Sequence, residues 1–408
     1  MSDTDGLAAR RTQDPQHAAA DAAAGRTLTG PADDGAGREA GSGGRWRPWP
    51  GGGRQRRSPG PRGGRTWRVV RRTALGLVLL LVLTTATAGL ALRLLYRGEV
   101  AADTSTRGRD ALWLGHAWVD GRHDEADVRA LLARTRGTGL RDLYVHTGPL
   151  EHDGTLPPGS RLYPRAGWFL SAVHRLAPAL RVHAWLGDKL TTGPGDGAAM
   201  DLADPATRRA VLASTRQVLD AGFAGVHFDL EPLASGDPGL LRLLDEVRPV
   251  LHARRALLSV SVGQIDPVPA AHTLLRAGTG HVKWVTQDYF GQVARRVDQI
   301  ALMTYDTALP LESLYGGYVA HQTRLALAAT GPGTDLLMGV PFYHDENWGH
   351  HASAETVRAT VRGVRLGLTR DGGRRSRFGL ALYVDYAATA TDWAAYRNGW
   401  GRVGAGAS

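Results

Sequence analysis

A short stretch in the middle of the chain, residues 222–232, limits the possible folds more than any other. Its core alternates apolar residues with ionisable ones, and the ionisable residues are His227, Asp229 and Glu231. Successive side chains of a strand point to opposite faces, so these three share one face. A face exposed to water would accept Thr, Lys or Ser at least as readily. In a parallel strand with both faces covered, three ionisable groups are costly unless they are paired or take part in chemistry.

The surrounding sequence alternates strand-like and helix-like segments from residue 111 to residue 403. Strands are expected at 111–118, 142–146, 181–186, a fourth segment ending at 231, 257–262, 299–306, 336–343 and 378–385. Helices are expected at 124–136, 168–177, 205–219, 240–253, 288–297, 321–329, 354–366 and 392–396. This order predicts an α/β fold, a (β/α)₈ TIM barrel, in which catalytic residues stand at the carboxyl ends of strands. A doubly wound open sheet is the alternative, but it would call for a glycine-rich phosphate loop after an early strand, which the sequence lacks.

The first part of the chain has a different composition. Residues 1–66 contain few large aliphatic side chains and are expected to be disordered. Residues 73–92 are uncharged and apolar, and about 20 such residues cross a bilayer. We therefore expect a basic cytoplasmic segment at 1–66, a transmembrane signal anchor at 67–97 and a polar linker at 98–110. The arginines that precede the span place the N-terminus in the cytoplasm and the barrel outside, in a single-pass protein of the cell membrane.

The net charge of +10 does not indicate nucleic-acid binding. Up to Glu99 there are sixteen Arg and eight acidic residues, whereas the remainder has 33 basic and 31 acidic residues. The excess positive charge thus belongs to the N-terminal segment up to Glu99 and not to the predicted barrel. The chain has no Cys, which excludes disulfides and thiolate metal sites. His116, His146 and His183 lie near strand ends without a recognised ligand spacing, and we expect no metal and no cofactor.

Three segments carry a resemblance to a known family. The stretch from Phe223 to Glu231 is similar to the signature of glycoside hydrolase family 18, the chitinases and their relatives. The matching positions are Phe223, Gly225, Asp229 and Glu231, while Ala224 and His227 stand where the family usually has Asp. The segment Met303–Asp306 reproduces the family's Met-x-Tyr-Asp motif, and residues 339–343 resemble its Gly-x-Pro-Phe-Tyr segment. In the eighth strand, Tyr383 is the nearest match to a Trp that forms the floor of the family's sugar site.

The resemblance implies a substrate-assisted glycosidase that cleaves β-linked N-acetylhexosamine glycans, chitin-like or peptidoglycan-like, with retention. Glu231 would be the general acid, with a pKa raised by burial and by Asp229. Asp229 would orient the acetamido group of the substrate, and Tyr305 would donate a hydrogen bond to its oxygen. The residues expected to contact substrate are His227, Asp306, Met303, Tyr343, Tyr383 and Trp185.

Three questions remain open at this stage. His227 either pairs with Asp229 as a cation in a retuned site or marks a catalytically weak or inactive barrel that only binds glycans. A two-carboxylate glycosidase of another barrel family is also possible, with Glu231 working beside Asp306 or Asp385. Other tryptophans are either sugar-stacking surfaces or core residues; they are Trp113, Trp118 and Trp348. The short passage between the last two strands predicts a shallow site.

Overall fold

The computed structural model describes residues 63–191, 199–280, 282–373 and 375–401. The chain divides into two units, Met1–Arg68 and Val69–Ser408, and the barrel lies in the second. The predicted disordered segment falls outside the described residues except for residues 63–66, which are helical.

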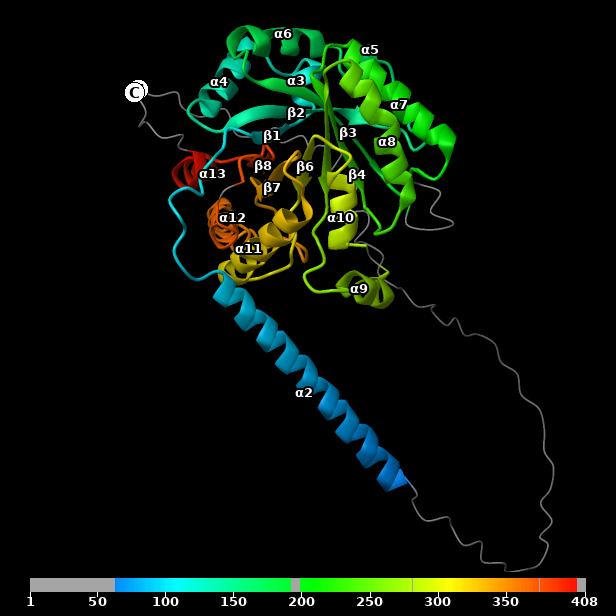
Figure 1. Cartoon of the computed structure of the whole chain (residues 1–408), viewed down its shortest axis with the longest axis vertical. Helices are drawn as coiled ribbons and strands as arrows, with labels where there is room; N and C mark the ends of the chain where they lie inside the picture. Colours follow the sequence, from blue (N-terminus) through cyan, green and yellow to red (C-terminus); the bar gives the residue numbers. More distant parts are fainter. Residues whose placement is uncertain (1–62, 192–198, 281, 374, 402–408) are drawn as a thin grey trace, which may run out of the picture. The chain divides into compact units, whose positions relative to one another are not determined.

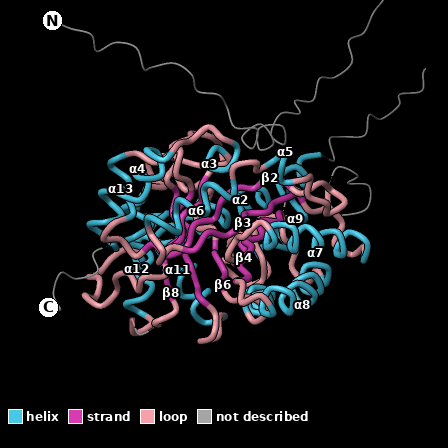
Figure 2. The backbone as a smooth tube through the Cα atoms, turned by 90° about the horizontal axis from the view of Figure 1, so that it is seen from above, coloured by secondary structure: helices cyan, strands magenta, loops and turns pink. Residues whose placement is uncertain are grey.

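Eight parallel strands close into a barrel in which each strand pairs with its neighbours in chain order and β1 pairs with β8 (Figures 1 and 2). The strands are β1 (Asp110–Leu114), β2 (Leu140–Pro149), β3 (Arg181–Lys189), β4 (Gly225–Glu231), β5 (Leu257–Val262), β6 (Gln299–Leu302), β7 (Asp335–Pro341) and β8 (Phe378–Tyr383). The predicted (β/α)₈ barrel is confirmed, and the open sheet is excluded.

Helices alternate with the strands and surround them (Figure 2). They are α3 (Ala117–Asp120), α4 (Glu125–Thr135), α5 (Gly159–Leu162), α6 (Ala166–Leu176), α7 (Pro205–Asp220), α8 (Pro238–Ala253), α9 (Ala271–Thr279), α10 (Gln287–Ala294), α11 (Glu312–Ala329), α12 (Val357–Arg370), α13 (Ala390–Tyr396) and the π-helical turn η1 (Arg397–Gly401). The carboxylate of Asp204 caps α7 by accepting from the backbone N–H of Ala206, and Pro205 occupies the first turn, as the sequence predicts.

Two apolar regions hold the barrel together. The larger lies between the strands and the helices, where strand residues such as Val226, Phe228 and Leu230 are fully or almost fully buried. The smaller fills the interior of the barrel. Its buried members are Ala111, Trp113, Tyr144, Trp185, Ala301, Leu337, Ala381 and Val384. Both faces of β4 are therefore covered, and its polar side chains must find partners inside the barrel.

Several predicted boundaries are wrong. The first strand ends at Leu114, and Trp118 lies in α3, where its indole N–H donates to Asp385 at 2.7 Å. The sixth strand ends at Leu302, so residues 303–306 follow it as irregular backbone. Helix α11 begins at Glu312, well before the predicted 321, and α9 was not expected.

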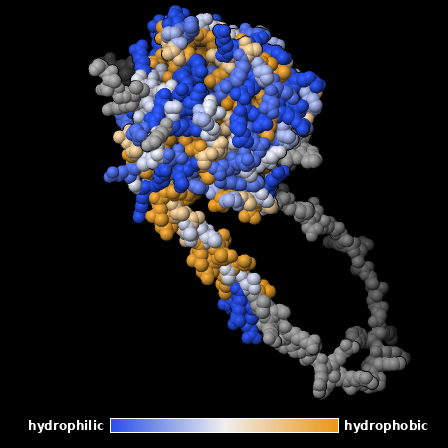
Figure 3. Space-filling model, viewed as in Figure 1, coloured by the Kyte–Doolittle hydropathy of each residue, from blue (hydrophilic) through white to orange (hydrophobic). Residues whose placement is uncertain are grey.

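Helix α2 (Gly63–Leu95) contains the predicted span. Its segment Val70–Leu95 is long and apolar enough to cross a membrane by length and composition, and hydrophobic side chains are exposed along it (Figure 3).

The chain that follows α2 packs on the barrel. The Tyr96 hydroxyl donates to Glu312 at 2.8 Å, and the backbone of Leu92 lies so close to Gly317 that no Cβ would fit there. The backbone N–H of Ala101 donates to the Thr369 hydroxyl at 3.0 Å. Thr104 is fully buried. The predicted polar linker, residues 98–110, is thus in contact with the folded domain rather than a free connection.

Candidate active site

The strand β4 brings its three ionisable residues into the barrel and toward its carboxyl end. His227 is fully buried, whereas Asp229 and Glu231 are partly buried. Burial, followed by the negative charges of Asp229 and Asp306, raises the pKa of Glu231 to about 8. A carboxyl group in this state carries a proton at neutral pH and is able to donate it.

Asp229 is held by two donors from the neighbouring strands. The indole N–H of Trp185 on β3 donates to Oδ2 at 3.0 Å, and the Ser261 hydroxyl on β5 donates to Oδ1. Burial raises the pKa of the Asp229 carboxyl, and both hydrogen bonds oppose that effect. Because Trp185 is 2% exposed, its hydrogen bond to Asp229 is its main contribution to the site in this structure.

Of the two alternatives for His227, the cationic pair with Asp229 does not form. Its Nδ1 lies 2.8 Å from the Ser259 hydroxyl, and its ring stacks on Tyr144 with centroids 3.9 Å apart. Its Nε2 has no hydrogen-bond partner among the residues that the structure describes. Burial lowers the pKa of His227 well below its usual range, because complete desolvation disfavours the imidazolium. The residue therefore sits below Asp229 as a neutral aromatic group.

The segment after β6 adds an aromatic wall. Tyr305 is buried, and its ring stacks on Tyr383 at 5.6 Å and meets Tyr343 edge-on at 5.7 Å. Burial raises the pKa of Tyr305 well above its usual range, so its hydroxyl remains a hydrogen-bond donor. Met303 is partly buried beside it. The structure thus gathers the predicted residues of strands six, seven and eight around one point.

Asp306 stands at the edge of this wall with an exposed side chain. Its backbone is in the left-handed region, with φ of 57°. The Tyr343 hydroxyl donates to its Oδ1 at 2.5 Å, and the Lys283 ammonium donates to its backbone carbonyl at 2.8 Å. Asp385 is the other carboxylate considered from sequence. It accepts from the Trp118 indole and from the backbone N–H of Gly115 at 2.9 Å, so it joins the segment after β8 to the segment after β1.

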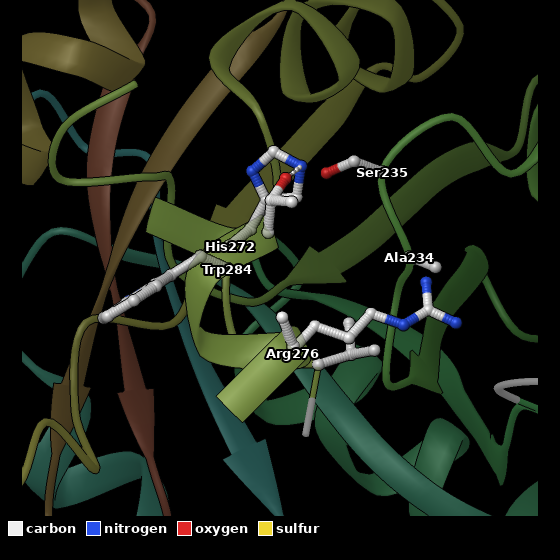
Figure 4. A pocket seen from close by; sticks show the side chains of 8 residues that line it. Ala234, Ser235, His272, Arg276 and Trp284 are labelled. Atoms are coloured by element: carbon white, nitrogen blue, oxygen red, sulfur yellow. Dashed lines mark hydrogen bonds between the residues drawn. The ribbon is translucent and has the colours of Figure 1, made fainter. Parts of the chain in front are cut away.

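A cavity of about 340 Å³ opens beside the end of β4 (Figure 4). It is lined by Ala234, Ser235, His272, Thr273, Arg276, Ala277, Val282 and Trp284. A chain of hydrogen bonds links it to the aromatic wall. The indole N–H of Trp284 donates to Gln264 at 3.2 Å, and the Gln264 amide donates to the backbone carbonyl of Tyr305 at 2.6 Å. None of the residues predicted from sequence lines this cavity.

Sequence reasoning missed the residues that support the site from β5. Ser259 and Ser261 lie opposite His227 and Asp229, because β4 and β5 are parallel and His227 is in register with Ser259. The alternation of Ser with apolar residues in 257–262 carries the same period of two as β4. That pattern would have placed both hydroxyls on the inner face.

A second missed group surrounds Asp306. In the part of the chain that the structure describes, Asp306, His350 and Glu355 each offer a ligand atom, and these atoms lie within 4.8 Å of one another. His350 and Glu355 come from the loop between β7 and α12 and are fully or almost fully buried. Nothing in their spacing along the sequence points to β6.

Comparison with known proteins gives similarity of fold only. No protein-family model matches the sequence, and no curated protein matches it. The spore cortex-lytic enzyme SleL of Bacillus cereus is 13% identical, with a TM-score of 0.50 over 74% of this chain and 76% of that chain. A class V chitinase from Pseudomonas fluorescens is 17% identical, with a TM-score of 0.47 over 71% of this chain and 98% of that chain. A family 18 chitinase from Cycas revoluta, solved with (GlcNAc)₃, is 16% identical, with a TM-score of 0.48 over 72% and 99%.

Proposed function

We propose that the protein is a membrane-anchored glycoside hydrolase that cleaves β-linked N-acetylhexosamine glycans by substrate-assisted hydrolysis with retention. The substrate class is chitin-like or peptidoglycan-like. The observation that carries the proposal is the position of Glu231 at the carboxyl end of a barrel strand, two residues after the fixed carboxylate of Asp229, where burial raises its pKa to about 8. An acid of this strength is protonated at neutral pH and can give its proton to a leaving glycosidic oxygen.

The neighbours of Glu231 suit the remaining steps. In a substrate-assisted reaction the acetamido oxygen of the substrate attacks the anomeric carbon, so one enzymic acid is sufficient. Asp229, which accepts hydrogen bonds from Trp185 and Ser261, would orient the acetamido N–H and stabilise the positive ring that forms. The Tyr305 hydroxyl remains protonated and is available to the acetamido oxygen.

The proposed location is supported by α2 and by the arginines before it. Residues 73–92 would cross the bilayer, the N-terminus would lie in the cytoplasm and the barrel would face the outside. A glycan of the cell exterior is then the substrate within reach. The exposed ring of Trp348, on the loop after β7, offers an apolar face for a sugar.

The test compares the parent protein with the variant Glu231→Gln. Both are used as full-length proteins in detergent, because residues 92–104 pack on the barrel and should not be removed. Chito-oligosaccharides and purified peptidoglycan serve as substrates, and products are followed by mass spectrometry. We expect cleavage by the parent and a loss of at least about a hundredfold in the variant. Glu346→Gln is the matched control, since Glu346 is an exposed carboxylate on the loop after β7. Equal cleavage by Glu231→Gln and the parent would refute the role of Glu231.

A second candidate is a glycan-binding barrel without turnover. It is favoured by the neutral His227 below Asp229, at a position where the resembled family has a carboxylate. Binding of chito-oligosaccharides by calorimetry, with no products after prolonged incubation, would select it. A two-carboxylate glycosidase that uses Glu231 and Asp306 is the third candidate, because the charge of Asp306 already acts on Glu231. Cleavage of glycans that lack an N-acetyl group would select this one.

A further inference from the structure

The loop between β7 and α12 holds a buried histidine between two carboxylates. The Nδ1 atom of His350 lies 3.1 Å from Asp306 Oδ1 and 3.4 Å from Glu355 Oε2. The side chains of His350 and Glu355 are fully buried, whereas that of Asp306 is 56% exposed. One N–H therefore faces two acceptors, and one of these acceptors belongs to the rim of the candidate active site.

Glu355 is itself fixed at its other oxygen. Its Oε1 accepts from both the backbone N–H and the hydroxyl of Thr307 at 3.0 Å, while its Oε2 has no hydrogen-bond partner within the described parts of the chain and lies 3.4 Å from His350 Nδ1. Thr307 follows Asp306 directly in the chain. Glu355 thus holds the backbone beside Asp306 and at the same time presents an unsatisfied oxygen to His350, which favours a proton on Nδ1 of the imidazole.

The ring of His350 also packs against the phenol that bonds Asp306. Its centroid is 4.4 Å from that of Tyr343, whose hydroxyl donates to the same Oδ1 that faces His350. The Asp306 carboxylate consequently accepts from two side chains of the segment that follows β7. Without them, a carboxylate that is more than half exposed on a left-handed residue would be free to rotate.

We propose that His350 and Glu355 are positioning residues that hold the Asp306 carboxylate against Tyr343 at the rim of the active site. The inference rests on the proposed function and deepens it. Burial lowers the pKa of His350, but the hydrogen bonds and charges of Asp306 and Glu355 outweigh it and raise that pKa to about 9. The resulting cation offsets part of the Asp306 charge, which is one of the charges that act on Glu231.

Other charged groups lie near Asp306 and contribute to the expected pH dependence of the reaction rate. The Lys283 ammonium lies at the Asp306 backbone, and burial lowers its pKa while Asp306 and Glu355 oppose that effect. On the loop itself, Glu346 pairs with His351 at 2.8 Å and feels His350 as a weaker charge. Variants of His350 must therefore be compared with a variant of its neighbour.

The experiment uses the full-length chain in detergent with His350→Gln, Glu355→Gln and Asp306→Asn. His351→Gln is the matched control, because His351 is the adjacent residue but pairs with the exposed Glu346. Removing the His350 cation leaves Asp306 uncompensated, so we expect the alkaline limb of the pH–rate profile to move upward by about one pH unit. The rate on chito-oligosaccharides should fall about tenfold. Both effects should disappear when His350→Gln is made in the Asp306→Asn background, because His350 acts through Asp306.

A second measurement does not need activity. With ¹⁵N-labelled histidine, the NMR signals of His350 should show an imidazolium at pH 7 in the parent and a lower titration midpoint in Asp306→Asn and in Glu355→Gln. A neutral His350 at pH 7 overturns the proposal even if the enzyme is active. So does a displacement of its signals by added Zn²⁺ or Ca²⁺ that EDTA reverses, since the three groups would then hold a cation. If the parent cleaves no glycan, only the proposed function fails, and the NMR titration still decides whether His350 and Glu355 hold Asp306.

Discussion

The indole N–H of Trp185 lies 3.0 Å from the carboxylate of Asp229 and donates to it from the adjacent strand. The buried ring cannot turn away, so the hydrogen bond fixes one rotamer of Asp229. In the proposed substrate-assisted reaction, that rotamer would set where the acetamido group is held.

Trp185→Phe should keep the packing and remove the donor. We expect the rate on chito-oligosaccharides to fall by at least about tenfold, since hydrogen bonds to charged groups contribute about 1.5–3 kcal/mol. The pKa of Asp229 should rise further, because Trp185 opposes the effect of burial. The control is Trp113→Phe, as the buried Trp113 indole N–H has no hydrogen-bond partner in the described part of the chain. Comparable losses in the two variants would assign the effect to packing rather than to the hydrogen bond.

Compared with the parent, Glu231→Gln should become the more stable protein as the pH increases. The unfolded chain loses the Glu231 proton near 4.5, whereas the folded protein keeps it to about 8. The free energy of unfolding of the parent therefore decreases across this interval, and the variant is spared that decrease. We expect its Tm to exceed that of the parent by a few degrees at pH 8 and to match it at pH 4. Thermal melts at both pH values measure this, and a constant difference would contradict the raised pKa.

The free energy of unfolding should decrease less steeply in acid for His227→Asn than for the parent. The pKa of His227 is depressed below 6.5, so the unfolded chain binds a proton first as the pH falls. The free energy of unfolding then decreases below about pH 6.5 by up to about 1.4 kcal/mol per pH unit. Denaturant titrations between pH 7 and pH 5 should show a shallower slope for the variant. His146, which burial also keeps neutral with a pKa of about 3, is present in both proteins and cancels. Equal slopes would mean that His227 is charged when folded.

Gly317→Ala should detach the end of α2 from the barrel. A Cβ at this position would clash with the backbone oxygen of Leu92. Because the clash involves a backbone atom, no change of side-chain rotamer can relieve it. We expect faster tryptic cleavage after Arg97 and a lower Tm. Gly331→Ala is the control, because a Cβ there meets nothing within 4 Å. Unchanged proteolysis in Gly317→Ala would show that the contact does not persist in solution.

The sequence predicted best those elements whose residues act locally. β5 has the bounds that its apolar and Ser alternation indicates, and Asp204 caps α7 as expected. The sixth strand was drawn too long, because residues 303–306 keep strand-like composition while they leave the ladder to form the site. Helix α11 begins before the predicted residue 321 and includes Gly316 and Gly317. They are helical and small so that Tyr96 and Leu92 can approach.

Long-range partners could not be read from the sequence. Glu231, Asp229, Tyr305 and Asp306 were singled out because they share motifs, and the structure gathers them at one end of the barrel. His350 meets a carboxylate 44 residues earlier, a relationship that only the barrel creates. The neutral state of His227 likewise depends on Tyr144 and Ser259, which lie on β2 and β5.

The docked segment after α2 changes how the protein would search for its polymer. A free tether would let the barrel explore a volume around its anchor, and its encounter rate would depend on tether length. In this structure Tyr96 is bonded to α11, Ala101 is bonded to α12, and Thr104 is buried in the folded domain. With α2 in a bilayer, as proposed, the barrel would therefore lose its movement toward and away from the membrane. In the proposed membrane protein, the site would then travel by lateral diffusion of the whole protein and would meet strands of glycan at one height above the lipid.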